Sequence, residues 1–279
     1  ESLKEIESEL LKKDSSLLVL HGAAESEIPQ MMKKHKLEAI FFNEDYTPYT
    51  QKRDKKVLSL LRKEQKNIHV YQDHVFYDPR KILKDDQTPY KVFTAYKNKW
   101  MRSFSTDQKN IVNYQNKRRS FYQWKNNNGL TKIDWFKKIG IEETTPYYKG
   151  GSKEGIKKLK KFREKIHLYE DTRDFPIKDG TSHLSVYIRF GTISIRQMFQ
   201  LANEDKSNGH LVWLSELVWR DFYQMISFHF PHISGKSFKE KYDQIEWLGE
   251  NSHFFAWKKG ETGFPIIDAS MRCLTLDFY

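Results

Sequence analysis

Hydrophobic residues in the first hundred positions form short runs, and amphipathic stretches separate these runs. Three runs are typical of buried strands and lie at 16–20 (SLLVL), 39–43 (AIFFN) and 68–72 (IHVYQ). Apolar residues spaced three and four positions apart predict helices over 1–13, 26–36 and 50–65. Because strands alternate with helices, this part of the chain predicts βαβ units and a parallel sheet.

The second half of the chain has a helical pattern throughout, and its predicted helices cover 154–170, 184–190, 194–203, 210–230 and 263–276. Residues 101–150 show weak periodicity, which indicates a connector with short helices. We therefore expect an α/β plus all-α fold: a parallel-sheet (Rossmann-like) domain at 1–100, a connector at 101–150 and a helical domain at 151–279. Residue 1 lies inside a predicted helix and residue 279 directly follows another, so we expect both domains to be truncated.

The segment 211–225 predicts a helix with two different faces. At roughly 100° per residue, one arc of about 120° holds Trp213, Glu216, Trp219, Arg220 and Tyr223. The other side, expected to face the core, gathers Leu211, Leu214, Val218, Phe222 and Met225. Because charges buried in a core need partners, the first face suits a flat aromatic ligand with charged or hydrogen-bonding edges. The alternative is a half-exposed helix with an ion pair between Glu216 and Arg220.

A second candidate site is the polar loop 179–185 (DGTSHLS), which precedes the predicted helix 184–190. Thr181, Ser182 and Ser185 place three hydroxyls beside the free N–H groups of a helix N-terminus, a favourable position for a phosphate. Simple N-capping of the helix by Thr181 or Ser182 is the alternative. Tyr169 and Arg173 lie one turn apart in the same helical half, which favours an aromatic cofactor that carries a pyrophosphate.

The amino-acid composition indicates which partners and which cellular compartment to expect. The chain has 48 Lys and Arg against 37 Asp and Glu, a formal net charge of +11, which favours a polyanionic partner unless the excess lysines only solvate helix faces. Cys273, the single cysteine, fits a reducing compartment, so we expect an intracellular protein, cytoplasmic if bacterial. No apolar stretch approaches the roughly 20 residues of a membrane span, and no membrane partner is expected. We predict no metal site, because the histidines lack metal-ligand spacing, and we expect a monomer.

Six multi-residue motifs occur in an order that resembles the DNA photolyase/cryptochrome family. They are 42–54 (FNxxYxPYxxxRD), 90–94 (YKVFT), 169–176 (YxxxRDFP), 180–187 (GTSxLSxY), 215–223 (SELVWRDFY) and 257–272 (WxxGxTGFPIxDAxMR). The resemblance spans nearly all of the chain. It is greatest to class I photolyases that act on cyclobutane pyrimidine dimers, because relatives that repair the (6-4) lesion usually carry Gln where Glu216 stands.

The resemblance implies roles for individual residues. The FAD site would be lined by Tyr169, Thr181, Ser182, Leu184, Ser185, Trp213 and Arg220. Damaged DNA would meet Arg173, Glu216, Trp219 and Tyr223, with Trp219 stacked on the flipped dimer and Glu216 bonded to its base edges. Trp247 matches the outermost tryptophan of a chain that carries electrons to the flavin.

The resemblance also implies an activity, the light-driven repair of pyrimidine dimers by electron transfer from reduced FAD, and a deoxyribodipyrimidine photolyase as the enzyme. An antenna chromophore, either a folate or a deazaflavin, is a further cofactor of such proteins. The main alternative is a cryptochrome-type blue-light photoreceptor with the same flavin. A flavin-free helical protein that binds DNA or RNA would explain the charge but not the loop 181–185.

The chain departs from the family pattern at both ends. Strands 1 and 2 of the family sheet, whose order is 3-2-1-4-5, are not found. Their absence would leave strand 3 about 14 Å from its nearest partner at a spacing of ~4.8 Å. After Met271 and Arg272 the sequence diverges from the family and stops. We therefore expect a fragment whose first domain is unstable and which, by itself, neither binds FAD stably nor repairs DNA.

Overall fold

The fold is described from a computed structural model, which covers residues 1–107, 121–123, 135–141, 149–247 and 249–277. It groups into two compact units, one formed by Glu1–Ile133 with Gly150–Ser234 and the other by Asp134–Lys149 with Gly235–Tyr279. The predicted domain bounds of 1–100, 101–150 and 151–279 stay a prediction. Much of the expected connector lies outside the described residues.

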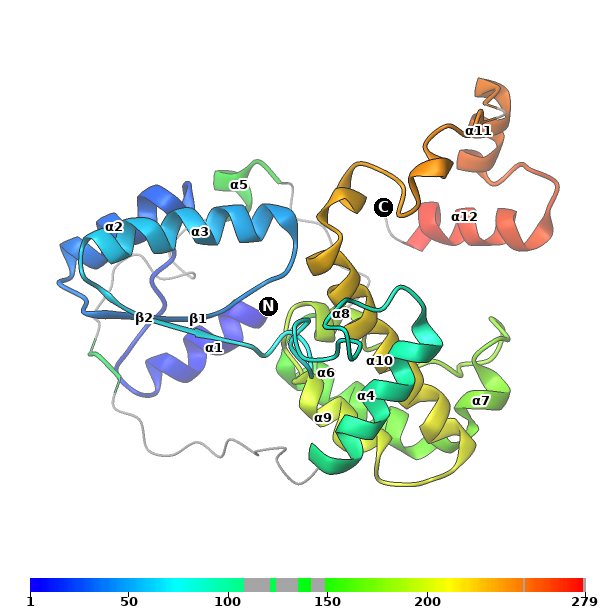
Figure 1. The fold of residues 1–279 in the computed structure, drawn as a ribbon, viewed down its shortest axis with the longest axis horizontal. Coiled ribbons are helices and arrows are strands. Elements are labelled where there is room, and N and C mark those ends of the chain that lie inside the picture. Colours follow the sequence, from blue (N-terminus) through cyan, green and yellow to red (C-terminus); the bar gives the residue numbers. More distant parts are fainter. Residues whose placement is uncertain (108–120, 124–134, 142–148, 248, 278–279) are drawn as a thin grey trace. The chain divides into compact units, whose positions relative to one another are not determined.

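The α/β part of the first unit contains a small parallel sheet. Strand β1 (Ala39–Asn43) pairs with β2 (Asn67–Tyr71) in the register Ala39↔Asn67 to Asn43↔Tyr71. Figure 1 shows α2 (Ala24–Lys34) and α3 (Pro48–Lys63) along one face of these strands. Thr47 fixes the start of α3, since its side chain accepts a hydrogen bond from the Thr50 N–H and Pro48 occupies the first turn.

Apolar side chains from both helices seal the covered face of the sheet. Met32 of α2 and the α3 residues Val57 and Leu61 form a buried cluster, against which Ile40 and Ile68 of the strands pack. On the opposite face, Phe41 is 63% exposed and stacks on His69 with ring centroids 4.5 Å apart. The alternation follows from the two-residue period of a strand.

The strand predicted at 16–20 is wrong, because residues 15–20 have no regular secondary structure. Apolar content alone cannot form a strand, since each strand needs a neighbour to satisfy its backbone N–H and C=O groups. Within the described residues the sheet consists of β1 and β2. The predicted helix at 1–13 is confirmed as α1 (Ser2–Leu11).

The helical part of the first unit is arranged around the 22-residue helix α10 (Asn208–His229). Its neighbours include α4, α7 and α9, and Figure 1 shows α4 and α9 beside it. These and the remaining elements are α4 (Phe93–Asp107), α6 (Ser152–Lys165), the 3-10 helix η3 (Ile166–Leu168), α7 (Tyr169–Thr172), α8 (Ser185–Arg189), α9 (Ile195–Ala202) and the 3-10 helix η4 (Pro231–Ser234). Ser194 and Gln197 form a capping box that begins α9.

Helix α10 begins in close contact with η3. A side chain at Gly209 would meet the backbone oxygen of Ile166 at 2.2 Å, so only glycine permits this approach. The approach brings α10 against the segment from which Tyr169 projects. On the predicted core side of α10, Leu214, Val218, Phe222 and Met225 are buried, whereas Leu211 is 42% exposed, so its prediction as a core residue is wrong.

The second unit contains α5 (Trp135–Ile139), the 3-10 helix η5 (Glu240–Tyr242), α11 (Asn251–Lys259) and α12 (Pro265–Asp277). Gly260, in the left-handed conformation with φ +72°, ends α11. Asp268 accepts hydrogen bonds from the N–H groups of Thr262 and Gly263 and so holds the turn before α12. None of the helices in the described ranges combines the length and the apolar character that crossing a lipid bilayer requires.

The observed architecture is a small parallel α/β part followed by a helical part, as the sequence predicts.

Candidate functional site

The predicted ligand-facing side of α10 carries a carboxylate that pairs with an arginine directly after α7. Arg173, which follows α7, donates from Nη1 to Oε1 of Glu216 at 2.6 Å. The side chains are 31% and 38% exposed, so the pair lies at the edge of the helical part and is open to solvent. The alternative pairing of Glu216 with Arg220 is wrong, since Glu216 bonds to Arg173 instead.

Tyr169 and Trp213 both pack against a buried phenylalanine. Phe162 of α6 is 1% exposed, and its ring centroid lies 5.9 Å from that of Tyr169 and 5.0 Å from that of Trp213. Trp213 itself is 3% exposed. Burial, with the nearby charge of Glu216, raises the pKa of Tyr169 above its ordinary value, which keeps the phenol neutral. Helices α6, α7 and α10 thus each contribute one ring to an aromatic group, which lies beside the ion pair of Arg173 and Glu216.

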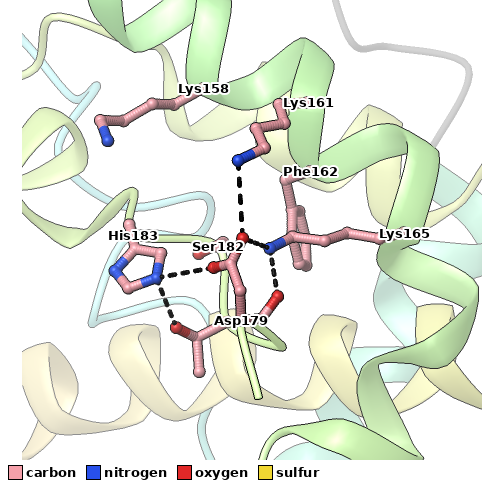
Figure 2. Close-up of a pocket in the computed structure, with 8 residues that line it drawn as sticks. Lys158, Lys161, Phe162, Lys165, Asp179, Ser182 and His183 are labelled. Carbon is pink, nitrogen blue, oxygen red and sulfur yellow. Dashed lines mark hydrogen bonds and ion pairs between the residues drawn. The ribbon is translucent and has the colours of Figure 1, made fainter. Parts of the chain in front are cut away.

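The loop 179–185 borders a cavity of about 50 Å³. Its lining residues are Lys158, Lys161, Phe162 and Lys165 of α6, together with Asp179, Thr181, Ser182 and His183 of the loop (Figure 2). Phe162 therefore borders both this cavity and the group formed by Tyr169 and Trp213. Three lysines on one helix face, next to two hydroxyls, make a site suited to an anion such as a phosphate.

An internal carboxylate partly balances these lysines. Asp179 Oδ2 lies 2.9 Å from Nζ of Lys165 and 3.5 Å from Nζ of Lys161, and Oδ1 lies 3.2 Å from the His183 ring (Figure 2). The hydrogen bond from Lys165 is the main reason that the pKa of Asp179 is lowered. His183 has φ +51°, a left-handed backbone that is unfavourable for a residue with a side chain, and Asp179 bonds to its ring.

The loop hydroxyls do not cap the helix that follows. Helix α8 has Leu184 as its N-cap residue and no side-chain cap hydrogen bond, so the capping alternative for Thr181 and Ser182 is wrong. Ser182 Oγ instead accepts a long hydrogen bond of 3.4 Å from the Leu184 N–H. The Leu184 side chain is fully buried, whereas Ser185 is exposed at the start of α8.

Arg220 lies farther along α10 and contacts a different part of the chain. It donates from Nη1 to the backbone oxygen of His74, and its Nη2 lies 3.3 Å from Nε2 of the same residue. Burial and the charge of Arg220 lower the pKa of His74, which favours the neutral imidazole. The structure therefore brings together Tyr169, Trp213 and Ser182 around Phe162, while Arg220 is bonded to the α/β part.

Trp219 and Tyr223 are further aromatic members of the same face, and Tyr223 is the more exposed of the two. Their ring centroids lie 5.4 Å apart at 22°, and Tyr223 is 61% exposed. Trp219 is half-buried and stacks on Phe93 at the start of α4, with centroids 3.5 Å apart and ring planes at 8°. The predicted electron-relay residue Trp247 belongs to the second unit and is 82% exposed.

A buried carboxylate that was not predicted, Asp221, lies beside this face. Asp221 is 1% exposed and accepts hydrogen bonds from the N–H groups of Phe76 at 3.3 Å and Tyr77 at 3.2 Å, and from Nε1 of Trp100 at 3.1 Å. Burial raises the pKa of Asp221 to about 6 even though three N–H groups stabilise the carboxylate. A charged residue between Arg220 and Phe222 on the apolar side of the helix was the available signal.

Two families of known proteins match parts of the sequence. The family described as DNA photolyase matches residues 1–113, and the FAD binding domain of DNA photolyase matches residues 213–277. The chain is 28% identical over 288 residues to a deoxyribodipyrimidine photo-lyase of Synechococcus sp., covering 98% of this chain and 59% of the relative. A relative of the same name from Alkalihalophilus pseudofirmus is 31% identical over 277 residues, covering 92% of this chain and 54% of the relative. The chain thus spans little more than half the length of these relatives.

Solved structures have the same fold. A class III photolyase from Agrobacterium tumefaciens superposes with a TM-score of 0.82 at 24% identity, covering 98% of this chain and 58% of that one. A cryptochrome from Synechocystis sp. superposes with a TM-score of 0.79 at 19% identity, covering 99% of this chain and 59% of that one. The six sequence motifs, the two matching family domains and the shared fold lead to one conclusion: the chain belongs to the DNA photolyase/cryptochrome family.

Proposed function

We propose that the protein to which this sequence belongs is a DNA photolyase that uses light to repair cyclobutane pyrimidine dimers. The proposal rests on two side chains, Glu216 and Trp219, that lie on adjacent turns of one face of α10. Glu216 offers a carboxylate and Trp219 an aromatic surface, and both are reached from solvent. A flipped pyrimidine pair needs these two features, one to bond to its base edges and one to stack on its rings.

We propose FAD as the cofactor, held by Tyr169, Thr181, Ser182, Leu184, Ser185, Trp213 and Arg220. The donor set fits such a group. Hydroxyls of Thr181 and Ser182 beside three lysines suit its phosphates. When bound, reduced and excited by light, FAD would supply the electron that opens the dimer.

The protein's own groups would bind and orient the substrate. Arg173 would contact the DNA backbone, and the net charge of +11 would draw the protein to DNA in a salt-dependent way. Trp219 and Tyr223 would exclude water from the face on which the bases stack. Trp247 is proposed as the outer residue of an electron relay. Its exposure of 82% suits an electron donor reached from solution.

Repair itself tests the proposal. The protein is loaded with reduced FAD, mixed with an oligonucleotide that contains one thymine dimer, and illuminated with blue light, and the restored thymines are measured by chromatography. We expect dimer loss in the light and none in darkness or with undamaged DNA. A flavin-loaded protein that leaves the dimer intact under illumination contradicts the proposal.

A cryptochrome-type photoreceptor is the second candidate, favoured by the fold shared with the Synechocystis cryptochrome. It predicts that light changes the flavin spectrum while the dimer persists. We further propose that the 279-residue chain alone does not repair DNA, which the same assay measures directly.

A further inference from the structure

Phe93 is the closest aromatic neighbour of Trp219, and the motif 90–94 in which it lies has no role in the function proposed above. The centroids of the phenyl and indole rings are 3.5 Å apart, and their planes differ by 8°. At this separation the phenyl ring fills one face of the indole, so a base can stack only on the other face.

The packing of α4 holds Phe93 in place. Phe93 meets Phe222 edge to face at 5.7 Å, and one turn later Tyr96 packs on Phe222 at 5.3 Å. Tyr96 is 1% and Phe222 is 5% exposed. The phenyl ring therefore belongs to a rigid layer between α4 and α10, and the indole rests on that layer.

Tyr223, the other stacked neighbour of Trp219, is held differently. Its ring is 5.4 Å from the indole, is tilted by 22° and is 61% exposed. Phe93 is thus close to the indole, parallel to it and anchored by α4. Tyr223 is farther away, tilted and open to solvent. Phe93, together with Phe222 edge to face at 5.6 Å, therefore holds the indole more firmly than Tyr223 does.

We propose that Phe93 is a positioning residue for lesion recognition, which backs the indole of Trp219 so that its opposite face is presented to the flipped pyrimidine pair. This inference rests on the proposed repair function. An indole without this support would occupy several rotamers, and binding would have to restrict it to one. Preference for damaged over undamaged DNA therefore depends on an aromatic ring at residue 93.

The test measures Kd in the dark for an oligonucleotide with one thymine dimer and for its undamaged counterpart. For Phe93→Leu we expect Kd for the damaged strand to rise about 5-fold, in line with the energy of an aromatic pair, with Kd for undamaged DNA within twofold. Phe93→Tyr restores the aromatic ring and should restore the preference. Val92→Ala, at a neighbouring side chain that is 64% exposed, is the matched control and should change neither Kd.

A double-mutant cycle separates positioning from general packing. In a Trp219→Ala background, Phe93→Leu should leave the affinity for the dimer unchanged, because the ring that it supports is gone. An unchanged dimer Kd in folded Phe93→Leu overturns the inference while the repair proposal stands. If Phe93→Leu does not fold, Phe93→Met takes its place, with the same outcome overturning the inference. A wild-type protein without preference for the dimer overturns both proposals.

Discussion

Nη1 of Arg173 lies 2.6 Å from Oε1 of Glu216 and joins the segment after α7 to the exposed edge of α10. The two residues were both predicted to meet damaged DNA, and they bind each other. Since both side chains are about one-third exposed, the pair stabilises the fold by about 1 kcal/mol at most. Its main consequence is for binding, because a lesion must share or replace this contact.

Replacing the carboxylate tests that consequence. We expect Glu216→Ala to raise Kd for a dimer-containing oligonucleotide about tenfold and to lower the repair rate, since a hydrogen bond to the bases is lost. FAD content, measured by absorbance, should stay the same. Glu216→Gln keeps the shape of the side chain and removes its charge. Its Kd and repair rate should lie between those of the wild type and those of Glu216→Ala. Repair by Glu216→Ala at the wild-type rate would exclude a role for this carboxylate.

Removing a positive charge and removing a negative charge near the loop 179–185 should change the affinity for FAD in opposite directions. Lys165→Gln removes a positive charge beside Thr181 and Ser182 and should weaken FAD binding about 3- to 10-fold at low salt. Asp179→Asn removes the internal carboxylate and should strengthen it. Flavin fluorescence quenching gives both affinities. Two shifts in the same direction would contradict a phosphate site beside these lysines.

Phe162 should contribute strongly to stability. We expect Phe162→Ala to lower the free energy of unfolding by about 3–5 kcal/mol, because it leaves a cavity beside Tyr169 and Trp213. Phe175→Ala is the matched control, since Phe175 is 53% exposed, and should cost less than about 1 kcal/mol. Urea denaturation followed by circular dichroism measures both values. Equal losses would mean that Phe162 is not a core residue.

Asp221 should make stability depend on pH. Its pKa is about 6 in the folded protein and close to 3.8 when unfolded, so the folded state binds more protons between these values. The contribution of Asp221 is therefore fully present below about pH 4 and is lost as the pH rises through about 6. Asp221→Asn removes this titration.

Unfolding free energies of the wild type and Asp221→Asn, measured in urea from pH 4 to pH 7, test the sign. Relative to the variant, the wild type should lose stability as the pH rises, by about 1–3 kcal/mol over this range. At every pH the variant lacks one acceptor for the donors of Phe76, Tyr77 and Trp100. A constant difference across the range would mean that Asp221 does not titrate there.

The spacing of apolar residues predicted those strands and helices whose formation depends on neighbouring residues in the sequence. The run at 39–43 is strand β1, and the two-faced pattern at 210–230 is helix α10. The run at 16–20 has the same composition as a strand but no pairing partner among the described residues, and pairing is not a local property. Helix α4 was missed, although Tyr96, Trp100 and Phe104 recur every four residues on its buried face.

Only part of the candidate site could be predicted from the sequence, for a similar reason. Residues within one helix, such as Glu216 and Trp219, could be assigned to one face from their spacing. The partners of Arg220 and Asp221 could not, because His74, Phe76 and Trp100 are separated from them by more than a hundred residues. Motif resemblance located the loop 181–185 but gave no indication of the lysines of α6 beside it.

The hydrogen bonds of Asp221 also constrain the order of assembly during synthesis. The donors at Phe76, Tyr77 and Trp100 leave the ribosome 121 to 145 residues before their acceptor. Contacts this far apart in sequence form slowly, since a long loop must close before they contribute. The N–H groups of Phe76, Tyr77 and Trp100 therefore lack this acceptor until α10 has been translated.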